Sequence, residues 1–289
     1  MTPSPSQRSG DLRHPLLVID GDSLTHRAYH ALPKTMKRAE GKPSNAIVGF
    51  TNFLMRLWQA EQPRAVLVGW DTLFVPTYRH ELFEGYQAGR EFDQALLEQL
   101  DLMPEVVQAF GFATAKGAGY EADDFLAAAV RLEEERGGTA VVATSDRDSF
   151  QLASERTTIL QPIKGVSELA RVGPTDVRER YGVDPAQVPD FIALRGDPSD
   201  KLPGARGVGP KTAANLLVQY GTLEAMLEEG RFEAQAEELR MYRRMATLDA
   251  SAPLPPLDDQ TPDWAGASTF FRELGMNAHA DRVAALASS

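Results

Sequence analysis

Short apolar segments that end in aspartate restrict the fold of this sequence more than any other feature. The clearest segments have the character of buried strands: residues 16–19, 64–70 and 139–144. Each is followed closely by aspartate: Asp20, Asp71 and the pair Asp146 and Asp148. Helical periodicity fills the stretches between them, and strands that alternate with helices predict an α/β fold with a parallel sheet. Because the carboxyl ends of parallel strands meet at one edge, we expect these acids to lie close together.

The rest of the sequence suggests four consecutive regions. Residues 1–14 lack an apolar signal core and are expected to form a flexible tail. Residues 15–172 contain the strand candidates, and residues 173–250 contain only helices and turns. Residues 251–289 combine a proline-rich linker with one or two closing helices. Two shorter segments are also strand candidates: residues 112–115 and 157–160.

The composition excludes several classes of protein. The sequence contains no cysteine, which excludes disulfides, thiolate nucleophiles and cysteine-ligated zinc. The absence of cysteine fits a reducing compartment, and we expect a cytoplasmic protein. No apolar run approaches the roughly 18 residues that span a bilayer. A membrane partner is therefore not expected.

Two further acidic motifs enlarge the set of candidate metal ligands. GYEADD contains Glu121, Asp123 and Asp124, and RGDPSD contains Asp197 and Asp200. Each has a simpler explanation when taken alone: GYEADD as an acid-rich first helical turn, RGDPSD as an N-cap pair, and the strand-end aspartates as Asx turns. Carboxylates at several buried strand ends nevertheless require positive charge nearby. Hard oxygen ligands suit Mg²⁺ or Mn²⁺, so the combined pattern favours a divalent metal site.

The net charge of −11 argues at first sight against a nucleic-acid partner. Nine acids are candidate metal ligands in this interpretation: Asp20, Asp71, Glu121, Asp123, Asp124, Asp146, Asp148, Asp197 and Asp200. Setting those nine aside from the 41 acidic residues leaves 32, against 30 Lys and Arg. The remaining surface is about neutral, and local basic patches that bind nucleic acid are compatible with the composition.

A glycine-rich segment, GARGVGPKTA, is the second strong signal. Its glycines permit a close approach of the backbone, and the amides at the start of the following helix can bind phosphate. The spacing is not that of a Walker A loop. The segment has the pattern of a helix-hairpin-helix element that grips a DNA backbone, although a plain connection between two helices is the alternative. The expected DNA contacts are Arg206, Gly207, Gly209, Lys211 and Thr212.

The order of these motifs resembles that of the bacterial 5′-nuclease family. The motifs are IDGD, WD, RHELFEGYQAGR, GYEADD, TSDRD and ALRGDPSDKLPGARGVGPKTA, and they cover roughly residues 15–250. The family includes the 5′→3′ exonuclease domain of DNA polymerase I and free-standing flap endonucleases. The resemblance implies a PIN-like parallel sheet within 15–172, a helical arch near 72–116 and a helix-two-turn-helix element near 175–225.

The resemblance also implies a two-metal phosphodiesterase that cuts DNA at a 5′ flap or at a 5′ end near a junction. In the family pattern one set of residues holds the first metal: Asp20, Asp71, Glu121, Asp123 and Asp146. A second set accompanies the second metal: Asp148, Asp197 and Asp200, with Asp124 nearby. The family further binds K⁺ through hairpin carbonyls, which correspond here to Ala205 and Val208. We expect a free-standing monomer that works beside a separate DNA polymerase and ligase.

One departure from the family pattern concerns the arch. The family usually places a lysine where this chain has Gln87, so a positive charge beside the scissile phosphate is missing. Arg79 and Arg90 are the expected substitutes, and both are predicted to be catalytic. The main alternative function is a DNA-junction binding protein with weak or no catalysis. A PIN-type ribonuclease is a third possibility, which the duplex-binding hairpin disfavours.

Overall fold

The computed structural model describes residues 13–87, 91–164 and 168–287. Within these ranges, six strands form one sheet. The strand order is β3-β2-β1-β4-β5-β6, and every neighbouring pair is parallel except β5 and β6. The strands are β1 (Leu16–Asp20), β2 (Ala65–Gly69), β3 (Ala113–Ala115), β4 (Ala140–Ala143), β5 (Thr157–Lys164) and β6 (Glu168–Val172). The predicted α/β class with a parallel central sheet is therefore confirmed.

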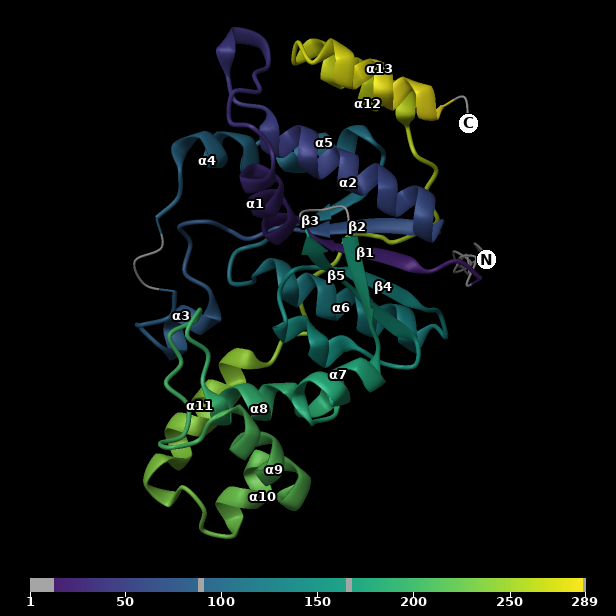
Figure 1. Cartoon of the computed structure of the whole chain (residues 1–289). Helices are drawn as coiled ribbons and strands as arrows, with labels where there is room; N and C mark the ends of the chain where they lie inside the picture. The colour runs from purple at the N-terminus through teal and green to yellow at the C-terminus, as the bar shows by residue number, and fades with distance from the viewer. Residues whose placement is uncertain (1–12, 88–90, 165–167, 288–289) are drawn as a thin grey trace, which may run out of the picture.

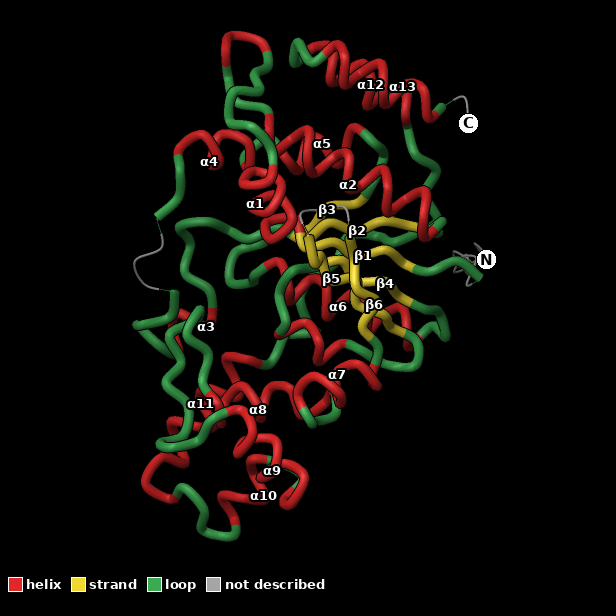
Figure 2. Tube along the Cα trace, in the orientation of Figure 1, coloured by secondary structure: helices red, strands yellow, loops and turns green. Residues whose placement is uncertain are grey.

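Helices cover both faces of the sheet, which forms the middle layer in Figures 1 and 2. One face carries α1 (Gly21–Ala31), α2 (Asn45–Glu61), α4 (Gln94–Leu100), α5 (Met103–Ala109), α12 (Trp264–Glu273) and α13 (Asn277–Leu286). The other face carries α6 (Ala122–Glu135), followed outward by α7 (Pro174–Tyr181), α8 (Val188–Arg195), α9 (Pro210–Tyr220), α10 (Leu223–Glu228) and α11 (Ala236–Ala246). The short helix α3 (Tyr78–Leu82) packs against α11.

Four short 3-10 helices, η1 to η4, complete the elements of the described residues. They are η1 (Ala39–Gly41), η2 (Asp148–Leu152), η3 (Pro185–Gln187) and η4 (Glu233–Gln235). None of the helices in the described ranges is long and apolar enough to cross a bilayer.

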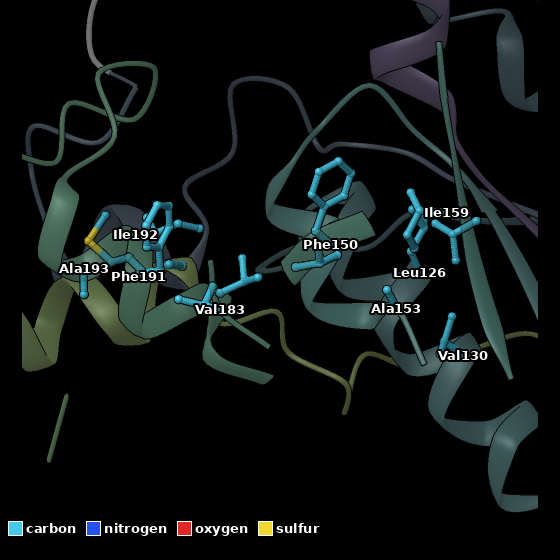
Figure 3. Packing of buried hydrophobic residues seen from close by; sticks show 14 of the residues in the cluster. Leu126, Val130, Phe150, Ala153, Ile159, Val183, Phe191, Ile192 and Ala193 are labelled. Carbon is cyan, nitrogen blue, oxygen red and sulfur yellow. The ribbon is translucent and has the colours of Figure 1, made fainter. Parts of the chain in front are cut away.

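The central strand β1 divides its side chains between two hydrophobic cores. Leu16 and Val18 belong to the core beneath α6, and Leu17 and Ile19 belong to the core beneath α2. This alternation explains why the strand is apolar at every position. Figure 3 shows the α6-side core continuing through Phe150 toward α8, so the sheet and the helical region share buried contacts.

Three details differ from the sequence-based expectations. The chain reverses after β5, so β6 adds an antiparallel edge strand that was not predicted. Helical periodicity extends over residues 93–110, but two helices form there, because Pro104 lies in the first turn of α5 and cannot continue α4. Helix α1 was also missed, although Asp20 caps it by accepting a hydrogen bond from the Ser23 amide at 2.9 Å.

Strand register explains why distant acids meet at one edge. Asp20 pairs with Gly69, two residues before Asp71, and β1 pairs in the same direction with β4. The segments that follow all three strands therefore leave the sheet on the same side. The predicted convergence of strand-end acids is a direct consequence of this parallel arrangement.

Candidate active site

A cavity of about 510 Å³ opens at the carboxyl ends of β1, β2 and β4. Nine of the residues that line it are carboxylates: Asp20, Asp22, Asp71, Glu91, Glu121, Asp123, Asp146, Asp148 and Asp200. Seven of these were predicted from the sequence as metal ligands. Asp22 and Glu91 were not, although Asp22 is part of the same IDGD motif as Asp20.

Hydrogen bonds between strand ends hold the first part of this wall. Asp20 accepts a hydrogen bond from the Thr144 hydroxyl at 2.7 Å, which joins β1 to the end of β4. Asp22 accepts from the Asp71 amide at 2.7 Å. Asp71 in turn accepts from the Ala122 amide at 2.8 Å, at the first turn of α6. The side chains are thus fixed by backbone groups of neighbouring elements.

Residues of the arch segment and α6 form the opposite part. Glu121 accepts hydrogen bonds from the hydroxyls of Thr77 at 2.9 Å and Tyr86 at 2.8 Å. Gln87 donates to the Tyr86 hydroxyl at 2.7 Å and to Asp200 at 3.4 Å. Gln87 therefore connects the two predicted groups of metal ligands, at the position where the family pattern has lysine.

The carboxylates in this cavity are short of compensating positive charge. Burial, reinforced by repulsion from Asp71, raises the pKa of Asp20 to about 7. Burial also raises the pKa values of Asp22, Asp123 and Asp148 well above their usual range, and neighbouring carboxylates add to the shift. A divalent cation would relieve both causes.

The carboxylate oxygens of this cavity are the type of ligand that a hard divalent cation prefers. The Oδ1 atom of Asp123 is buried and has no hydrogen-bond partner, and nine carboxylates line the cavity. No three acidic or imidazole groups within the described ranges already converge on one point. Several carboxylates are instead directed to protein donors, as described above for Asp71 and Glu121.

Asp124 and Asp197 lie behind the cavity wall. Asp124 is fully buried and accepts hydrogen bonds from the amides of Glu121 at 3.0 Å and Asp249 at 2.8 Å. Asp197 accepts from the Ser199 amide at 2.8 Å and from Arg195 at 3.1 Å. Direct metal binding by these two residues stays a prediction, whereas their observed contacts fix the start of α6 and the turn after α8.

Arg79 lines the cavity, and its side chain is almost fully buried. It makes two hydrogen bonds to Asp124, at 3.0 and 3.1 Å, and approaches Glu121 at 3.2 Å and Asp123 at 3.4 Å. Its Nε atom donates to the Met245 carbonyl at 3.0 Å. Arg79 therefore neutralises part of the acidic wall, and its predicted contact with a phosphate stays a prediction. Arg90, the other predicted catalytic residue, lies outside the described residues.

The glycine-rich segment forms a tight turn between α8 and α9. Directly before this segment, backbone hydrogen bonds at 2.8 and 2.9 Å join Asp197 and Leu202. A Cβ atom on Gly204 would lie only 2.4 Å from the Gly196 nitrogen, so glycine is required there. The predicted DNA contacts that follow are exposed: Arg206, Gly207, Gly209, Lys211 and Thr212.

Ala205 and Val208, the predicted K⁺ ligands, border a separate cavity of about 570 Å³ beside this turn. The Ala205 carbonyl accepts a hydrogen bond from the Val208 amide at 3.1 Å. The two residues whose carbonyls are the predicted K⁺ ligands are thus linked by this turn and border the same cavity. K⁺ binding itself stays a prediction.

Comparison with known proteins gives this geometry its context. The family model of the 5′-3′ exonuclease N-terminal resolvase-like domain matches residues 15–182, and that of the 5′-3′ exonuclease C-terminal SAM fold matches residues 183–264. The chain belongs to the 5′-3′ exonuclease family. The resemblance inferred from the order of the sequence motifs is confirmed.

Relatives of this exonuclease-family chain include DNA polymerase I of Mycobacterium leprae, which is 45% identical over 74% of this chain and 24% of its own length. DNA polymerase I of Bacillus caldotenax is 36% identical over 94% of this chain and 32% of its own length. The chain thus spans about a quarter to a third of these relatives. A bacteriophage T5 flap endonuclease solved with DNA and metal ions has the same fold, with a TM-score of 0.67, 18% identity and coverage of 96% of this chain and 100% of that one.

Proposed function

We propose that this chain is a metal-dependent 5′ nuclease that hydrolyses DNA phosphodiesters near single-strand to double-strand junctions. The observation that carries the proposal is the cavity at the strand ends, which nine carboxylates line, four of them with raised pKa values. Such a set is costly to the fold and is suited to divalent cations. Family membership and a structural neighbour solved with DNA and metal ions support the same function.

In this proposal residues 15–172 carry the chemistry. Two or more Mg²⁺ or Mn²⁺ ions would lower the pKa of an attacking water and stabilise the charge that develops on the phosphate. Asp20, Asp71, Asp123 and Asp146 would hold the first ion together with Glu121, and Asp148 and Asp200 would hold the second. Asp124 and Asp197 are assigned to the same set in the family pattern, and here they would act by fixing the two elements that carry the ligands. Arg79 would orient Glu121 and Asp123, with which it is paired.

Residues 173–250 would hold the duplex. The amides and basic side chains around Gly207, Gly209 and Lys211 would contact the phosphate backbone without reading sequence. K⁺ would bind the carbonyls of Ala205 and Val208 beside that contact. The remaining residues, 251–289, would brace α2 and α5 through α12 and α13.

Incubation of labelled 5′-flap DNA, hairpin RNA and single-stranded DNA with the protein tests this function. Cleavage of flap DNA that requires Mg²⁺ or Mn²⁺ and stops in EDTA is expected. Flap binding without cleavage in either metal would favour the alternative function, a protein that binds DNA junctions with weak or no catalysis. That alternative is suggested by Gln87, which stands where the family pattern has a lysine. Preferential cleavage of RNA would contradict the proposed substrate.

Metal binding should stabilise the fold more at high pH than at low pH. Carboxylates with raised pKa values stabilise the folded state below their unfolded pKa, and this contribution is lost as pH rises through the folded pKa, near 7 for Asp20. Metal competes with these protons and offsets the loss. At about 100 Kd of Mg²⁺, a gain of roughly 2.7 kcal/mol raises Tm by about 5–10 °C at pH 8.

The comparison of Tm in Mg²⁺ and in EDTA isolates this effect. Burial lowers the pKa of His279 to about 4, so its own contribution rises with pH up to about 6.5 and opposes that of the acids. It is the same in both buffers and cancels in the difference. The Tm difference should fall toward zero at pH 5, and a difference that is equal at pH 5 and pH 8 would contradict the metal site.

Lys211→Ala should weaken binding to duplex-containing DNA similarly across sequences, because a phosphate contact carries no sequence information. The slope of log K against log salt should decrease in magnitude by about one unit. Affinity for a single-stranded oligonucleotide should change less. Lys42→Ala, which removes an exposed lysine paired with Glu40, is the matched control and should leave the slope unchanged. Equal losses for duplex and single-stranded DNA would contradict the duplex contact.

A further inference from the structure

Three aromatic rings lead from the carboxylate cavity to the protein surface. His26 and Phe92 line the cavity, and their ring centroids lie 5.6 Å apart in an edge-to-face arrangement. Phe74 follows at 6.3 Å from Phe92, again edge-to-face. Phe74 and Phe92 also line an adjoining cavity of about 280 Å³, which shares Asp71 and Gln87 with the first.

Phe74 is held outward by a backbone conformation that phenylalanine rarely adopts. Its side chain is 80% exposed, and its φ angle is +65°. It lies in a turn closed by a hydrogen bond of 3.2 Å from the Val75 amide to the Thr72 carbonyl. Glycine or asparagine is the usual residue at such a position. Neither packing nor turn geometry accounts for a large aromatic ring here, and strained, exposed residues beside an active site favour a binding role.

The chemistry of the surroundings identifies the ligand that suits this ring. The cavity beside it repels phosphate unless metal is present, while the exposed face of Phe74 is apolar. Four large apolar residues are strongly exposed in the described ranges, and only Phe74 among them is aromatic: the others are Val75, Ile163 and Val218. An unpaired nucleobase presents a free π-face, whereas a paired base inside a duplex is covered by its neighbours.

We propose that Phe74, supported edge-on by Phe92, is a stacking platform for an unpaired nucleobase of the substrate strand. The inference rests on the proposed function, because it requires the phosphodiester of that strand to lie over the carboxylate cavity. The platform selects substrates whose strand is unpaired next to the cut. Stacking tolerates any base sequence, so the platform responds to the presence of a base and not to its identity.

A set of matched flap substrates tests the platform. Each carries an abasic nucleotide at one of the first unpaired positions of the 5′ flap, and each is compared with the intact flap under single-turnover conditions. The wild-type protein should lose about tenfold in kcat/KM at one of these positions, on the scale of one base–aromatic stack. Phe74→Ala should lose about as much on the intact flap and show no further loss on the abasic one.

Phe74→Trp keeps an aromatic ring and should discriminate between intact and abasic flaps as the wild-type protein does. Val218→Ala is the control, because Val218 is an apolar residue on α9 that is about as exposed as Phe74, and it should behave as wild type. Binding of a flap that contains 2-aminopurine, measured in Ca²⁺ in place of Mg²⁺, addresses the same contact while a divalent cation compensates the carboxylates. Its fluorescence should be quenched by the wild-type protein and not by Phe74→Ala.

The two proposals fail in different ways. Quenching that depends on Phe74, with no cleavage in any metal, would overturn the nuclease function and keep the platform. Cleavage that does not distinguish abasic from intact flaps, or discrimination that survives in Phe74→Ala, would overturn the platform and keep the nuclease.

Discussion

Replacing Asp148 with asparagine is expected to lower single-turnover cleavage of 5′-flap DNA by more than about 100-fold. Loss of an outer-shell partner of a metal ligand typically costs 10- to 100-fold, so loss of a ligand should cost more. Asp148 lines the cavity, and burial together with repulsion from Asp146 raises its pKa. The affinity for flap DNA in EDTA should stay the same or increase, because one charge that repels phosphate is removed.

Asp148 is preferable to Asp197 for this experiment, because its replacement tests the cavity without disturbing the hairpin turn. Asp197 accepts hydrogen bonds that hold the turn after α8, so its replacement would change the hairpin as well. Asp101→Asn removes an exposed carboxylate at the end of α4 and serves as the control, with wild-type cleavage expected. Undiminished cleavage by Asp148→Asn would remove Asp148 from the metal site. A parallel loss of flap binding and of Tm would assign it a structural role.

The acidic cavity could be predicted from the sequence, because each strand with its terminal aspartate is a continuous segment that can be recognised by itself. An apolar run that ends in aspartate, repeated between helices, leads to a parallel sheet with acids at one edge, and the register of β1 with β2 and β4 confirms this. Asp22 was recognised as part of the IDGD motif but was not counted among the metal ligands, for a related reason. Helix α1 was not recognised, and without it Asp22 had no assigned direction toward the amide of Asp71.

The partners of Asp124 and Arg79 could not be predicted from the sequence. Arg79 meets Asp124 from 45 positions away and the Met245 carbonyl from 166 positions away, and no periodicity encodes such contacts. All three acids of the motif GYEADD were counted as candidate metal ligands, with Asp124 placed near the second metal. The structure separates them, because Asp123 faces the cavity while the carboxylate of Asp124 points to buried donors. Tertiary packing makes that distinction.

The exposure of Phe74 could not be predicted from the sequence pattern either. The segment after Asp71 has no periodicity, and the positive φ of Phe74 depends on the turn closed by Val75 and Thr72. Phenylalanine is normally expected in a core. The structure places it in the wall of the smaller cavity that adjoins the acidic one, and this position gives it the role proposed above.

Arg79→Ala is expected to lower the free energy of unfolding by about 3–5 kcal/mol in EDTA. Removing one partner of a buried ion pair leaves the other charge uncompensated, and Asp124 is fully buried. For a chain of this length the loss corresponds to a decrease in Tm of about 10 °C. Arg272→Ala breaks an exposed pair with Asp281 and is the matched control, with a change below about 0.5 kcal/mol.

Two further variants separate the structural role of Arg79 from its predicted contact with phosphate. Arg79→Ala combined with Asp124→Asn should recover part of the lost stability, because the unpaired carboxylate is removed as well. Arg79→Lys keeps the charge and loses the two-pronged contact with Asp124, so an intermediate stability is expected. If Arg79→Lys restores stability but cleavage stays low at saturating metal, Arg79 contributes to the reaction beyond its support of Asp124. Stability equal to wild type in Arg79→Ala would show that the acidic wall does not depend on this arginine.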